Sequence, residues 1–197
     1  MDPAPAARMA AFALLLGCAA LAAPRALALP TPENATDVAC ADDADRALKT
    51  EPAVFVRIYG SHTGNQWAVA DATTLHRVAV DPDIYSEVAH AWWVEGRVAV
   101  VDIASRSLEF RADASYCFRR SGTLARVIET SSGGNTIDDE TRYLDELGNV
   151  VQRRSHFSNI YPRPGSTLSP DLRPATPALY LTVSSLPFYE LIVPTAP

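Results

Sequence analysis

The stretch Cys117-Phe118-Arg119-Arg120-Ser121-Gly122-Thr123-Leu124 decides the fold, because it returns in outline 26 residues later. The second copy is Tyr143-Leu144-Asp145-Glu146-Leu147-Gly148-Asn149-Val150. Each copy has the pattern of a strand end, a polar turn with a glycine and a return strand, since glycine permits the positive φ that tight turns need. Two such β-hairpins in tandem predict an antiparallel meander, whereas two loosely identical copies do not indicate a solenoid.

Strand signals also fill the residues before these hairpins. Glu95-Gly96 is a typical two-residue hairpin connection, and turns are predicted at 60–64, 81–83 and 112–114. The expected strands are rich in β-branched and aromatic residues and cover 53–59, 67–70, 75–80, 85–94, 97–103, 107–111 and 115–119. We therefore predict a mainly β (α+β) fold with one curled antiparallel sheet. A β-sandwich or a small barrel is the alternative.

A short helix is expected before the strands and an irregular tail after them. Thr36 can cap the helix, and its apolar stripe comprises Val38, Ala41, Ala44, Ala47 and Leu48. The stripe is mostly alanine, so the anchorage of the helix depends on Cys40. Five prolines between residues 162 and 177 exclude a central strand there and predict a wrap over the sheet. Residues 180–183 then read as a last strand, and 185–191 as a capped helical turn that plugs the core.

The first 28 residues have the pattern of a cleaved export signal. Arg8 precedes an apolar run over 9–23, and Ala26-Leu27-Ala28 supplies the small residues before a cleavage site. The run is too short to span a bilayer of ~30 Å. Leu15-Leu16-Gly17-Cys18 also fits a lipoprotein cleavage site, which would make Cys18 a lipid anchor. Either cut predicts a periplasmic or secreted protein. The domain organisation expected after the signal is a tether at 29–35 and one β-rich domain over 36–197, with an irregular tail that begins at 158.

Export changes the cysteine count and the charge of the chain. Cys40 and Cys117 remain, and an even pair in an oxidising compartment predicts one disulfide. A loop of about 77 residues gives roughly 4 kcal/mol of stabilisation in the chain-entropy model. Two buried free thiols are the alternative. Without residues 1–28, 15 of the 17 basic and 22 of the 23 acidic side chains remain, a formal charge of −7. This charge argues against a nucleic-acid partner and against adhesion to an anionic membrane.

No convergent catalytic or metal-ligating pattern follows. The four histidines (His62, His76, His90 and His156) include no pair at helix or strand spacing that would bind one metal. His62 lies at the centre of Gly60-Ser61-His62-Thr63-Gly64, where a nucleophile elbow needs serine, so a plain turn is expected. The adjacent acids at 138–140 would point in alternating directions, which favours a solvated hairpin tip over a calcium site. We predict no cofactor and no metal.

A low-specificity surface site is the remaining candidate, formed by His62, Trp92, Trp93, Arg119 and Arg153. Adjacent tryptophans on a strand face opposite sides of a sheet. One indole is expected in the core, and the other is either covered by the tail or free to stack on a sugar or peptide. Arg119-Arg120 and Arg153-Arg154 lie on the two similar hairpins. They form either an anion-binding patch or a solvated face paired with acids.

Residues 107–192 resemble exported bacterial proteins that carry no assigned function. The shared pieces are Tyr116-Cys117-Phe118-Arg119-Arg120-Ser121-Gly122-Thr123-Leu124-Ala125 and Ser184-Ser185-Leu186-Pro187-Phe188. The resemblance implies a β-rich exported domain and no catalytic residues. We therefore expect a non-enzymatic binding or envelope-associated protein with an envelope or extracellular ligand. The alternative is a hydrolase with a site around His62 or His156 and nearby acids, since distant strand residues can converge.

Overall fold

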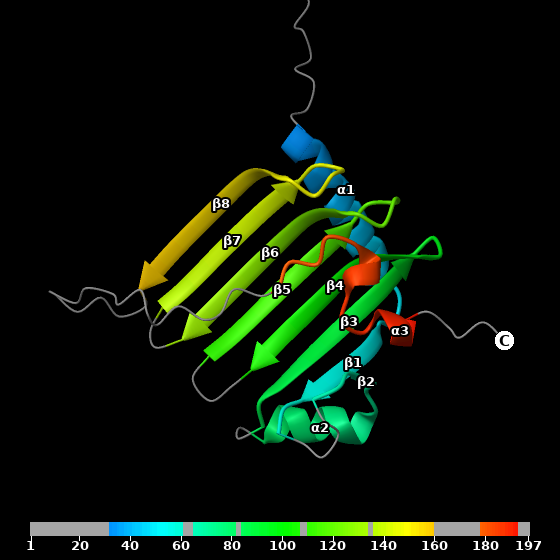
Figure 1. The fold of residues 1–197 in the computed structure, drawn as a ribbon, viewed down its shortest axis with the longest axis vertical. Helices are drawn as coiled ribbons and strands as arrows, with labels where there is room; N and C mark the ends of the chain where they lie inside the picture. Colours follow the sequence, from blue (N-terminus) through cyan, green and yellow to red (C-terminus); the bar gives the residue numbers. More distant parts are fainter. Residues whose placement is uncertain are drawn as a thin grey trace, which may run out of the picture.

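The computed structural model describes residues 32–60, 65–81, 84–106, 110–133, 136–159 and 178–192. Eight strands form one antiparallel sheet (Figure 1): β1 (Ala53–Ile58), β2 (Ala68–Val69), β3 (Ser86–Val94), β4 (Arg97–Arg106), β5 (Phe110–Phe118), β6 (Leu124–Gly133), β7 (Thr136–Leu144) and β8 (Val150–Asn159). Their order is β2-β1-β3-β4-β5-β6-β7-β8, so β2 and β8 are the two edges. The predicted meander is confirmed, and the described residues form an open sheet instead of the alternative sandwich or barrel.

The two similar hairpins have the same hydrogen bonds, which confirms the repeat. In the β5–β6 turn, Arg119 N donates to Thr123 O at 2.8 Å and Gly122 N donates to Arg119 O at 2.9 Å. In the β7–β8 turn, Asp145 N donates to Asn149 O at 2.9 Å and Gly148 N donates to Asp145 O at 3.2 Å. Gly122 and Gly148 have φ of 82° and 85°, a region that favours glycine.

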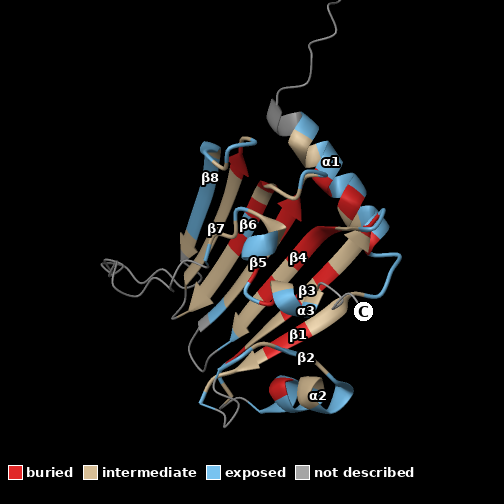
Figure 2. Ribbon diagram, turned by 45° about the vertical axis from the view of Figure 1, so that its right-hand side comes forward, coloured by how far each residue is buried: buried red, intermediate tan, exposed pale blue. Residues whose placement is uncertain are grey.

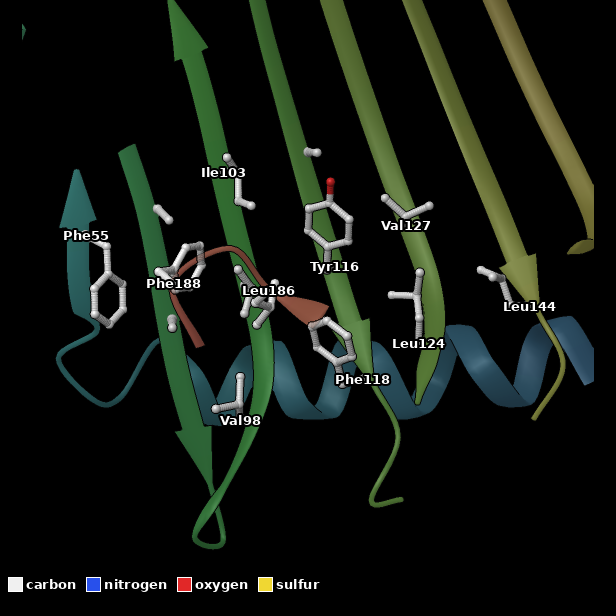
Figure 3. Close-up of a cluster of buried hydrophobic side chains, with 14 residues drawn as sticks. Phe55, Val98, Ile103, Tyr116, Phe118, Leu124, Val127, Leu144, Leu186 and Phe188 are labelled. Carbon is white, nitrogen blue, oxygen red and sulfur yellow. The ribbon is translucent and has the colours of Figure 1, made fainter. Parts of the chain in front are cut away.

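One face of the sheet, which we call face A, is covered by the C-terminal segment, residues 178–192. This segment contains the 3-10 turn η2 (Val183–Ser185) and the helix α3 (Tyr189–Ile192). Leu186 and Phe188 enter the main apolar cluster, and Phe188 stacks on Phe55 with ring centroids 4.8 Å apart (Figure 3). Residues 180–183 form only a single bridge, Thr123↔Thr182, instead of the predicted strand. The expected aromatic plug of the core is confirmed.

The opposite face, face B, carries the helix α1 (Pro32–Ala47) across one end of the sheet (Figure 1). The predicted disulfide is present: Cys40 and Cys117 are joined with a Cα–Cα distance of 5.9 Å. Two ion pairs flank it, from Asp43 to Arg97 at 2.8 Å and from Asp37 to Arg126 at 2.7 Å. A covalent bond and charge pairs therefore attach α1 to the sheet.

The predicted apolar stripe of this helix was wrong at its large residues, as was its start at Thr36. Val38 is 61% exposed and Leu48 is 78% exposed; of the predicted stripe only Ala47 is buried, together with Cys40 and Asp43, which lie outside it. The paired carboxylate and the disulfide decide which side faces the sheet, and the small apolar stripe was too weak to compete. The helix begins four residues earlier because proline is tolerated in a first helical turn.

Two further predictions of local structure were wrong. Residues 75–80 belong to the helix α2 (Ala72–Val80), where the Asp71 carboxylate accepts a hydrogen bond from Thr74 N at 2.7 Å. This N-cap outweighs the strand preference of the β-branched residues. The predicted turn at 112–114 lies inside β5, paired on both sides with β4 and β6. Glu95 and Gly96, with φ of 54° and 78°, form the expected tight turn.

Burial is greatest in the central strands and decreases towards β8 (Figure 2). None of the described helices is both long and apolar enough to span a membrane. The predicted export signal at 1–28 and the prolines between 162 and 177 lie outside the described residues.

Candidate functional site

A pocket of about 360 Å³ opens on face B, on the part of the sheet beyond α1. Four adjacent strands, β3 to β6, supply its side chains. Strand alternation places the polar lining residues on face B, on the same side as Cys117. The lining comprises His90, Asp102, Ile103, Ala104, Arg111, Asp113, Ala114, Ser115, Ile128 and Thr130.

Asp102 lies at the centre of this pocket in a row that crosses three strands. The register pairs it with His90 of β3 on one side and with Ser115 of β5 on the other. Directly opposed residues of neighbouring strands have Cβ atoms about 5 Å apart, so both side chains flank the carboxylate. The row is therefore a histidine, an aspartate and a serine, with the aspartate in the middle.

The Asp102 carboxyl is held in a poorly solvated place. Burial raises its pKa, and a hydrogen bond from Ser115 and the positive potential of His90 offset part of that rise. Oδ1 of Asp102 is buried and accepts no hydrogen bond from the described residues. A buried acceptor without a donor is rare in folded proteins, and a bound molecule with N–H or O–H groups would satisfy it.

The rim of the pocket is a mixture of charge and hydrocarbon. Arg111 Nε lies 2.6 Å from Asp113 Oδ2, so this arginine is already paired. Ile128 and Ala104 supply apolar surface, and Thr130 supplies a hydroxyl. The set is typical of a small-molecule site, in which a few placed polar groups orient a ligand against apolar walls.

The order of the row limits the chemistry of the pocket. His90 and Ser115 are two strands apart, about 10 Å, because neighbouring strands are about 4.8 Å apart. Histidine therefore does not take the serine proton directly, as a nucleophilic triad requires. Among the described residues, no group of three or more His, Cys, Asp or Glu side chains is placed to bind a metal ion.

The residues of the predicted surface site do not converge on this pocket. His62 lies outside the described residues. Trp92 packs against the cluster under α1 and stacks on His90, with ring centroids 5.8 Å apart, whereas Trp93 packs against the core of face A. The two indoles therefore cover different faces, and Trp92 supports the pocket through the His90 ring.

The arginines of the two hairpins have separate partners. Arg119 donates to the carbonyl oxygens of Leu124, Leu144 and Asp145, and so ties one hairpin to the other. Arg120 pairs with Glu95 at 2.9 Å. Arg153 pairs with Glu140 on face A, and Arg154 lies over the Tyr143 ring, 5.3 Å from its centroid.

A second charged group lies on face A, next to the apolar core. Arg142 pairs with Glu129 and with Glu140, the latter at 3.2 Å from Nε, and Arg153 completes the group. Glu129 is buried, and burial raises its pKa. Two glutamates and two arginines balance in charge, so we interpret this group as a structural ion-pair network that fixes the register of β6 to β8.

Sequence reasoning missed the pocket residues because they are 12 and 13 positions apart in the chain. His90 has no local pattern that distinguishes it from the other histidines, and Asp102 and Ser115 belong to no motif. One signal was present: Asp102 interrupts the apolar run from Val98 to Ile103. A charge inside a buried strand is costly unless it is paired or functional. His156, the other histidine of the hydrolase alternative, faces Asp139 across β7 and β8, away from this row.

Comparison with known proteins adds no relative: neither a family model, nor a curated protein, nor a solved structure matches this chain.

Proposed function

We propose that this chain is an exported, non-enzymatic binding protein whose small ligand occupies the face B pocket. The observation that carries the proposal is the buried Asp102 oxygen, which has no donor among the described residues and lies at the centre of a polar recess. Export is supported by the pattern of residues 1–28 and is compatible with the Cys40–Cys117 disulfide, since such bonds persist in oxidising compartments.

Binding is preferred over hydrolysis because of the order of the row. The Asp102 carboxylate accepts a hydrogen bond from Ser115, and His90 lies on the other side of the aspartate, two strands away from the hydroxyl. Such an arrangement orients a ligand donor and does not generate a nucleophile. The rigid sheet beneath the row holds the three side chains in place without a ligand, which lowers the ordering cost of binding.

The test is NMR mapping of amide shifts with a set of small probes that differ in charge: glycerol, glucose, sodium acetate, sodium butyrate and n-butylammonium chloride. We expect at least one probe to shift the amides of Asp102, Ser115 and Thr130 together. Shifts confined to other surfaces, or none with any probe, would overturn the proposal.

A catalytic assay completes the test. We expect no turnover of p-nitrophenyl acetate or p-nitrophenyl phosphate. Turnover that disappears in Ser115→Ala or Asp102→Asn would show that the pocket is an active site and that the protein is an enzyme.

A further inference from the structure

The charge balance of the pocket points to the chemical class of its ligand. Two carboxylates, Asp102 and Asp113, face one cation, Arg111. Arg111 is paired with Asp113 at 2.6 Å, so its charge is largely neutralised at the rim. Asp113 also adds negative potential at Asp102. The carboxylates of the lining therefore outnumber its arginine by one.

The hydrogen-bonding groups of the pocket also favour a ligand that carries donors. The Ser115 hydroxyl already donates to the Asp102 carboxylate, and no donor in the described part of the chain reaches Oδ1. Ile128 and Ala104 provide hydrocarbon beside it. The complementary molecule carries several N–H donors and a positive charge on a short apolar stem.

We infer that the pocket takes a small organic cation, a primary ammonium or guanidinium on a short hydrocarbon, whose N–H groups donate to Asp102. This inference rests on the proposed binding function. The apolar stem would lie against Ile128, beside the Asp102 carboxylate. An ammonium offers three donors to the carboxylate, and a guanidinium offers a planar pair.

Binding of such a cation depends on pH through the Asp102 carboxyl. The titratable or charged groups facing Asp102 are His90 on β3 and Arg111 and Asp113 on β5, while β6 contributes only Ile128 and Thr130. Protonation of Asp102 removes the attracting charge. This change weakens binding of a cation as the pH falls, and it would strengthen binding of an anion.

The experiment uses three probes of similar size: n-butylammonium chloride, 1-butanol and sodium butyrate, titrated by NMR in phosphate buffer, since Tris is itself a primary amine. We expect the ammonium to shift the amides of Asp102, Ser115 and Thr130 with a Kd at least tenfold below that of either other probe. Asp102→Asn should weaken this binding at least tenfold. Asp139→Asn, on face B outside the pocket lining, should leave it within twofold.

The outcomes separate the ligand class from the general function. If 1-butanol or butyrate binds at the pocket as tightly as the ammonium, the cation inference fails and the binding function stands. The cation inference also fails, with the binding function intact, if Asp102→Asn binds the ammonium as well as the parent does. If no probe of any charge moves the pocket amides, both fail.

Discussion

At the scale of single residues, the Asp102 carboxyl is costly to the folded state. Burial raises its pKa, so the folded chain holds this proton more tightly than the unfolded chain does. Below about pH 3, both states carry the proton and the cost is absent. As the pH rises from the unfolded pKa through the folded pKa, the carboxylate must ionise in a poorly solvated place and stability is lost.

Asp102→Asn should therefore stabilise the protein by about 1 kcal/mol at pH 7.5, the usual cost of an unsatisfied buried group. The gain should vanish below about pH 3. Urea unfolding at both pH values measures it, with Asp139→Asn as the control for a change of net charge. An equal gain of unfolding free energy at both pH values, or a loss at pH 7.5, would contradict the conclusion that the ionised Asp102 carboxylate destabilises the fold.

Arg119 makes several of the contacts that join the two similar hairpins. Its guanidinium reaches three carbonyl oxygens of β6 and the β7 end and also pairs with Glu146 at 3.2 Å. Lysine has one ammonium and cannot reach the same set. We expect Arg119→Lys to lose about 2 kcal/mol of unfolding free energy.

The neighbouring Arg120 provides a matched control for that measurement. Its side chain is 77% exposed and pairs only with Glu95 among the described acids. Arg120→Lys should change the unfolding free energy by less than about 0.5 kcal/mol. Equal losses for the two variants would show that the carbonyl contacts of Arg119 are not stabilising.

At the scale of elements, α1 depends on its disulfide. The bond closes a loop of 77 residues, and few apolar side chains of the helix are buried. We expect the double variant Cys40→Ala/Cys117→Ala to lose about 4 kcal/mol in urea unfolding. Val38→Ala, on the exposed side of the helix, should lose less than about 0.5 kcal/mol. A loss below about 1 kcal/mol for the double variant would mean that the ion pairs suffice to hold α1.

The sequence predicted elements well where one local signal dominated. The turns at Glu95-Gly96, Gly122 and Gly148 need positive φ, and glycine marks such positions directly. The helix α2 was mistaken for a strand because its β-branched residues outnumbered its single cap, Asp71. The pocket could not be predicted by spacing, since its residues meet only through the register of β3, β4 and β5. The interrupting charge at Asp102 was the one local sign of it.

At the scale of the whole molecule, the C-terminal segment completes the core. Phe188 is buried between Phe55 and Trp67, with ring centroids 4.8 and 4.9 Å away. Phe188→Ala should lose about 4 kcal/mol of unfolding free energy. Leu191→Ala, at a half-exposed position in the same segment, should lose less than about 1 kcal/mol. A mild effect of Phe188→Ala would show that the sheet is stable without its cover on face A.

The stacking of Phe188 on Phe55 also dictates an order of events during biosynthesis. Phe55 belongs to the first strand, whereas Phe188 follows the last one, so almost every residue of the sheet is synthesised between the two partners. Until that ring arrives, the apolar surface around Phe55 and Phe118 lacks the cover that Leu186 and Phe188 provide in the folded state. Contacts between residues so far apart in sequence slow folding. Intermediates that expose apolar surface therefore persist for longer. A nascent chain with this arrangement would need a chaperone, or rapid synthesis of residues 178–192, to avoid aggregation.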